Sequence, residues 1–161
     1  MTKLLALIPL AACAHAPAPK TPKLEPPIDS LAFYVGTWRC HGTSYATADT
    51  PQQTWDAIVK VTPELDGTWL GVEMIGPGVN RTVEHKGYDP DTKRWIHVAV
   101  GNGGLFALVT SHGWTGNHMD FVPEPDDHTK TTFTKLDDTH YNHAVSSADG
   151  RKIWEKTCAK S

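Results

Sequence analysis

Histidine is the residue type in this chain with the widest chemical repertoire, and the sequence contains nine of them. His140 and His143 form a His-x-x-His pair, and such a pair binds a metal ion only when both rings share one face. The surrounding residues predict a β-strand, where an offset of three points the two rings to opposite faces. We therefore predict no metal site in this chain.

Catalytic motifs are absent from the sequence. It has no nucleophile elbow, no His-Glu-x-x-His and no Walker-type phosphate loop. A pair of catalytic carboxylates needs a cleft that shifts the pKa of one of them, whereas the clustered aspartates of this chain fall in predicted loops. These aspartates are Asp126, Asp127, Asp137 and Asp138. The sequence favours a non-enzymatic protein with no catalytic residue and no resident cofactor.

The first of three cysteines ends an apolar run. The last four residues of this run are Leu10-Ala11-Ala12-Cys13, and they resemble a bacterial lipobox, in which the cysteine becomes lipidated. This interpretation gives a signal peptide over residues 1–12, a lipidated Cys13 with a proline-rich tether over 13–27, and one domain over 28–161. Cleavage of an ordinary signal peptide after Ala14 is the alternative, and both versions export the chain.

The location that follows is the bacterial cell envelope, on the periplasmic side, with the outer membrane as the expected anchor site. Membrane contact is expected through the lipid, because no apolar run approaches the length of a transmembrane helix. The formal net charge of −3, without a basic cluster, excludes nucleic acid as an expected partner.

The domain pattern is that of an all-β protein. Residues 28–35 predict a short helix, and from Gly36 onward apolar residues alternate with polar ones between regularly spaced turn signals. No later segment has a helical period, so consecutive strands are expected to pair antiparallel. About ten strands result, and an up-and-down sheet that closes into a β-barrel removes its exposed edges.

Alternation also predicts which side chains face inward. Trp55 and Val59 share the apolar face of one strand, and His143 shares a face with Tyr141 and Val145. His85 shares a face with Val83, so we expect its ring inside as well. The conservative interpretation of both inward histidines is a hydrogen-bonded interior side chain.

Several segments resemble bacterial secreted calycin-like (lipocalin-like) barrels of the family called domain of unknown function 1579. They are residues 33–42, 65–69, 87–90, 103–104 and 155–158. The resemblance implies a barrel with a lumen and assigns no activity. In calycins a Gly-x-Trp opens the first strand and its Trp closes one barrel end, a role that falls here to Gly36 and Trp38.

Barrel closure has a consequence for the remaining cysteines. The last strand of a closed barrel pairs with the first, which would bring Cys158 beside Cys40. We predict a disulfide between them, with two buried free thiols as the alternative.

The expected function is binding of a small apolar or amphipathic ligand in the lumen. One alternative is haem, because nitrobindin-type calycins share Gly-x-Trp and bind haem through a late-strand histidine, here His143. This chain departs from that pattern in Cys40 and in the tether. A second alternative is a structural or envelope-interaction protein with a filled barrel. The predicted ligand-lining residues are Trp55, Val59, Met74, His85, Phe106 and His143.

Overall fold

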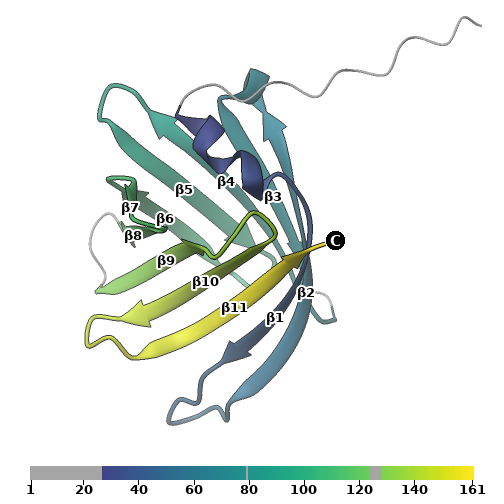
Figure 1. Ribbon diagram of the computed structural model, residues 1–161. Coiled ribbons are helices and arrows are strands. Elements are labelled where there is room, and N and C mark those ends of the chain that lie inside the picture. Colours follow the sequence, from purple (N-terminus) through teal and green to yellow (C-terminus); the bar gives the residue numbers. More distant parts are fainter. Residues whose placement is uncertain (1–26, 79, 124–127) are drawn as a thin grey trace, which may run out of the picture.

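The computed structural model describes residues 27–78, 80–123 and 128–161 (Figure 1). The predicted signal peptide, Cys13 and the tether up to residue 26 lie outside the described residues. Within the described part of the chain, no helix is long and apolar enough to cross a membrane.

The described residues form two short 3-10 helices and eleven strands. In chain order the elements are η1 (Ile28–Tyr34), β1 (Gly36–Ser44), β2 (Gln53–Glu64), η2 (Leu65–Gly67), β3 (Trp69–Ile75), β4 (Arg81–Asp89), β5 (Arg94–Gly101), β6 (Phe106–Ser111), β7 (Trp114–Thr115), β8 (His118–Pro123), β9 (Thr129–Lys135), β10 (His140–Ser147) and β11 (Lys152–Lys160).

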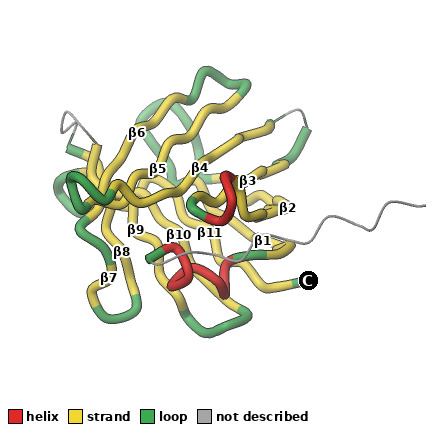
Figure 2. The backbone as a smooth tube through the Cα atoms, turned by 90° about the horizontal axis from the view of Figure 1, so that it is seen from above, coloured by secondary structure: helices red, strands yellow, loops and turns green. Residues whose placement is uncertain are grey.

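Ten of these strands close into an antiparallel barrel, and β7 is an additional short strand beside β8 (Figure 2). Neighbours in the barrel wall follow chain order, and β1 pairs with β11. The ring is completed where β6 meets β8, and among the described residues Val109 pairs there with Pro123 and Thr110 with Val122. The prediction of an all-β, up-and-down barrel of about ten strands with a short N-terminal helix is confirmed.

The pairing of β1 with β11 places Cys40 opposite Cys158 in register. Their sulfur atoms lie 1.98 Å apart, at disulfide distance, across 118 residues of sequence. Closure of the barrel therefore brings together the two cysteines that the sequence paired.

One end of the barrel is filled by η1 and by aromatic side chains. The indole of Trp38 is fully buried and donates a hydrogen bond of 2.8 Å to the carbonyl oxygen of Tyr34, the last residue of η1. The Tyr34 ring lies edge-on to Phe133 and to Tyr141, with centroids 5.0 and 5.1 Å apart. Trp38 thus closes one barrel end and fixes the short helix to the first strand.

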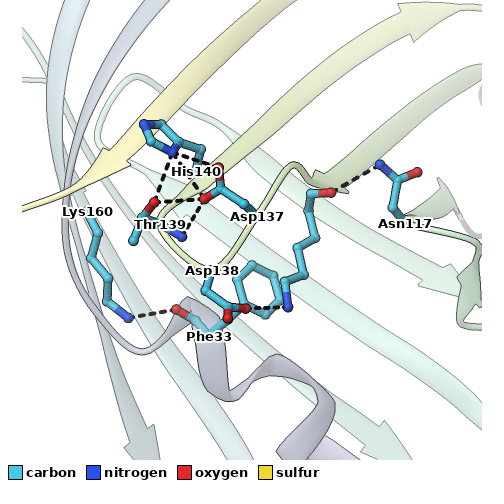
Figure 3. Close-up of polar contacts among 8 residues, drawn as sticks. Phe33, Asn117, Asp137, Asp138, Thr139, His140 and Lys160 are labelled. Atoms are coloured by element: carbon cyan, nitrogen blue, oxygen red, sulfur yellow. Dashed lines mark hydrogen bonds and ion pairs between the residues drawn. The ribbon is translucent and has the colours of Figure 1, made fainter.

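Polar contacts at the surface hold η1 in the same place. Lys160 near the end of β11 donates a hydrogen bond of 2.9 Å to the carbonyl oxygen of Phe33 (Figure 3). Lys135 lies 4.7 Å from the centroid of the Phe33 ring and forms an ion pair with Asp138 in the loop before β10. We call this end, with η1, Trp38, Tyr34, Phe133 and Tyr141, the plugged end.

Candidate functional site

The half of the barrel opposite the plugged end contains a cavity of about 430 Å³. Its rim is apolar and comes from the strand ends farthest from η1 and from the loop before β6. The rim residues are Leu105, Phe106, Leu108, Pro123, Val145 and Trp154. Its floor is polar and is formed by Glu84, His97, His143 and Lys156.

The floor contains a compact hydrogen-bonded cluster on β4 and β5. Lys86 Nζ lies 2.7 Å from Glu84 Oε2, and both side chains are almost completely buried. His97 Nε2 lies 3.0 Å from the same carboxylate oxygen and 3.2 Å from Lys86 Nζ, and in the tautomer with its proton on Nε2 it donates to Glu84. The carboxylate thus accepts from a cation and from an imidazole inside the barrel.

Electrostatics fix the charge states of this cluster. Burial alone would raise the pKa of Glu84, but the charge of Lys86 and the hydrogen bond from His97 outweigh it and hold that pKa well below the usual value. Burial and the charge of Lys86 lower the pKa of His97. Glu84 is therefore ionised and His97 neutral at pH 7.

The other side of the floor is formed by β10 and β11, where His143 and Lys156 are direct cross-strand neighbours. His143 is 3% exposed, and neither of its ring nitrogens has a hydrogen-bond partner among the described residues. Burial, followed by the charges of Lys156 and Lys86, holds the pKa of His143 well below its usual value. A neutral imidazole with two free nitrogens therefore borders the cavity.

A family model for proteins of unknown function, DUF1579, matches residues 25–153. The chain belongs to the DUF1579 family. No curated protein matches the chain significantly.

A solved structure shares the fold of this DUF1579 barrel. The crystal structure of Rv2717c from M. tuberculosis is similar with a TM-score of 0.66 and 10% identity, over 86% of this chain and 99% of that one. A protein of unknown function from the DUF3598 family of Nostoc punctiforme has a TM-score of 0.45 and 14% identity, over 92% of this chain and 53% of that one. The first likeness supports the barrel fold, and the second carries no argument.

Three of the six predicted lining residues border the cavity of the DUF1579 barrel: Met74, Phe106 and His143. Met74 and His143 do so from the inner face of their strands. Phe106 lies at the rim and is 72% exposed. Its partner across β5 is the exposed Val100, whereas the neighbouring Ala107 pairs with the buried Ala99, so Phe106 lies on the outer face of β6 and borders the cavity from its edge.

Two predicted residues face inward without bordering the cavity. Trp55 covers Gly42, where a Cβ atom would lie 2.3 Å from the indole, and its ring packs edge-on against Trp154. Trp55 therefore supports Trp154, which lines the cavity. Val59 is completely buried in the core near the plugged end.

The expectation that His85 points into the lumen is wrong. Its ring lies on the outer face, with a side chain that is 46% exposed and a contact of 3.0 Å to Glu64. The inner face of β4 is formed instead by Thr82, Glu84 and Lys86. Alternation gave the period of the strand correctly but assigned its two faces the wrong way round.

Sequence reasoning therefore missed most of the polar floor. The expectation that His85 and Val83 face inward implied that Glu84 and Lys86 face solvent, and Lys156 was assigned no role. The available signal was the pair of opposite charges at an offset of two, which shares one face of a strand. His97 lies in a strand with apolar residues on both faces, so alternation did not place its ring.

Proposed function

We propose that this DUF1579 barrel binds a small amphipathic molecule in the cavity. The apolar body of the ligand would contact the rim around Phe106 and Val145, and a polar group would reach the floor near His143. The volume of about 430 Å³ lies within the usual range for small-molecule sites, which combine apolar walls with a few polar groups.

The observation that carries this proposal is the pair of free nitrogens on His143. Buried polar groups in folded proteins nearly always have hydrogen-bond partners, and an unmade bond in an apolar setting destabilises the fold. His143 lines the cavity and has no such partner among the described residues. A ligand with a polar group at this depth would supply the missing bond.

A pair of substitutions on β9 tests the site. Thr131 lines the cavity, whereas its neighbour Lys130 is exposed on the outer face. We expect Thr131→Trp to abolish the fluorescence enhancement of N-phenyl-1-naphthylamine, an apolar probe, and the control Lys130→Trp to retain it. Equal probe binding by both variants would contradict binding in the lumen.

Haem is the second candidate ligand. A neutral, buried histidine with a free nitrogen facing a cavity suits an axial ligand, and His143 meets this requirement. The bound group would supply iron-centred redox or gas-binding chemistry. The absorption spectrum and native mass of the purified chain separate the candidates, because haem gives a Soret band, another retained ligand only added mass, and a filled barrel neither.

We also propose that the chain is an envelope lipoprotein, anchored through Cys13 on the periplasmic side. Leu10-Ala11-Ala12-Cys13 behind an apolar run supports this proposal, and so does the Cys40–Cys158 pair, which suits an oxidising compartment. The exported chain should partition into the detergent phase on phase separation, and Cys13→Ser should move it to the aqueous phase. A wild-type chain that stays in the aqueous phase would contradict the anchor.

A further inference from the structure

The charges on the cavity floor do not balance. The floor and the adjoining cluster contain two buried lysines, Lys86 and Lys156, and one buried glutamate, Glu84. Lys86 is paired with Glu84, and the histidines are neutral. One positive charge therefore remains inside the barrel, and Lys156 carries it.

Lys156 has no anionic partner within hydrogen-bond distance among the described residues. Its side chain is 1% exposed, and no carboxylate of the described residues lies within ion-pair distance of its Nζ. The ammonium group contacts the thioether sulfur of Met74 at 3.2 Å, a weak acceptor, and lies 5.9 Å from the centroid of the Trp154 ring. An isolated buried ammonium ion is costly, which makes this position a strong site for an anion.

We infer that the ligand carries a single negative charge, such as a carboxylate or sulfonate, which Lys156 binds directly while His143 donates a second hydrogen bond. This inference rests on the proposed function and adds the chemical class of the ligand. Lys156 and His143 border the same cavity from adjacent strands, so one head group can meet both side chains. A neutral imidazole has one N–H to donate, and a carboxylate or sulfonate accepts at more than one oxygen.

Matched probes separate the head group from the apolar body. 1-Anilinonaphthalene-8-sulfonate and N-phenyl-1-naphthylamine share their aromatic rings and differ in the sulfonate. In fluorescence titrations at pH 7, Lys156→Met should weaken binding of the sulfonate probe at least about tenfold, the effect of losing one charge-assisted bond. Binding of the neutral probe should change less than about twofold. Met is similar in length to Lys and suits the apolar contact with Met74.

Lys130→Met is the control, because Lys130 is on the outer surface and half exposed, beside Asp120. It should bind both probes as the wild type does. His143→Phe, which keeps an aromatic ring, should weaken only the sulfonate probe, by about threefold. Far-UV circular dichroism of each variant reports whether the barrel is intact.

Competition with a matched pair of aliphatic compounds gives an independent measurement. In the wild type, dodecanoate should displace the neutral probe at a concentration at least about tenfold lower than dodecanol. In Lys156→Met most of this advantage of dodecanoate should be lost, because His143 is then the remaining contact of the floor with the head group.

The pH dependence gives a third readout. Burial lowers the pKa of Lys156 to about 8. The groups that face it are Glu84 and Lys86 of β4, His97 of β5 and His143 of β10. The sulfonate stays ionised, so its affinity should hold steady up to about pH 8 and then fall as Lys156 loses its proton. Lys156→Met should remove this fall.

The outcomes are distinct. If Lys156→Met changes the affinity for both probes equally, or changes neither, the inference of an anionic ligand is overturned. The proposal that the cavity binds an apolar ligand is not contradicted by that result. If Lys130→Met loses binding of the sulfonate probe, that probe binds on the outer surface, and the inference of an anionic ligand in the cavity is overturned as well. If neither probe binds the folded wild type, the proposed function itself fails.

Discussion

The two ends of this barrel use the same strands for opposite purposes. Along the inner face of β10 the chain passes from Tyr141 at the plugged end to His143 and then to Val145 at the rim. Rings at the plugged end pack edge-on against one another, whereas the side chains of the floor are ionisable and leave a cavity. Tight aromatic packing is thus at one end, and the buried ionisable side chains and the cavity are at the other.

Truncation of one tryptophan at each end should show the largest difference. Trp38 is completely buried in the plugged end, so Trp38→Ala should lower the free energy of unfolding by about 4 kcal/mol. Trp154→Ala, at the half-buried cavity rim, should cost about 1 kcal/mol by lost apolar area. Urea denaturation followed by circular dichroism measures both. Equal losses would contradict the division into a stabilising end and a binding end.

The disulfide should give the next largest effect. It closes a loop of 118 residues and joins the strands beside Trp38, so the double variant Cys40→Ala with Cys158→Ala should lose about 3 kcal/mol. Thiol counting on the denatured wild-type chain should find neither Cys40 nor Cys158 free. Probe binding at the cavity should persist under conditions where the variant stays folded. Two reactive thiols in the oxidised wild type would contradict the pairing.

On the cavity floor, the substitution Lys156→Met should stabilise the fold, in contrast to the changes above. The pKa of Lys156 is about 8 in the folded chain, below its ordinary value of 10.5, so the folded state binds its proton more weakly than the unfolded chain does. Lys156→Met should therefore raise the free energy of unfolding at pH 7 by about 2 kcal/mol. The gain should shrink between pH 8 and 10.5, where the wild type becomes more stable. A variant less stable than the wild type at pH 7 would mean that the ammonium group stabilises the fold.

The smallest expected effect is acid sensitivity of the cavity floor. The pKa of His143 lies well below 6.5 in the folded state, so below pH 6.5 the unfolded chain binds a proton that the folded chain does not. As the pH falls below 6.5, this difference lowers the free energy of unfolding by about 1.4 kcal/mol for each pH unit. His143→Phe should reduce the overall slope by the share of one proton and leave the share of His97, whereas His41→Phe on the outer surface should keep the whole slope. Unchanged acid sensitivity in His143→Phe would assign the effect to other groups.

The fold was largely predictable because its signals are local. Alternation in β2 placed Trp55 and Val59 on the inner face, where they lie. The Leu65-Asp66-Gly67 turn begins a hairpin in which Asp66 and Gly67 adopt positive φ angles of 57° and 88°. Glycine adopts such angles at no cost and aspartate tolerates them. The pairing of Cys40 with Cys158 follows from closure of the barrel, which places the last strand beside the first.

The site was less predictable because the rule for interior faces assumes an apolar interior. In β4 the more polar face, with Glu84 and Lys86, points inward, because Glu84 accepts hydrogen bonds from Lys86 and from Nε2 of His97, whose Nδ1 has no partner among the described residues. Mutual satisfaction depends on contacts between different strands, which no single stretch of sequence reveals. His85 was misplaced for this reason, and Phe106 borders the cavity from the outer face of β6 rather than from inside the barrel.

The position of η1 also determines at which end of the barrel, relative to the cavity, the chain enters. The chain enters the barrel at Ile28, beside Trp38 at the plugged end, and the cavity rim is formed by the opposite ends of the strands. Any attachment upstream of residue 27 therefore joins the pole farthest from the mouth. If that attachment held the barrel to a membrane, the anchor would join the closed pole, and ligand would enter and leave at the opposite pole.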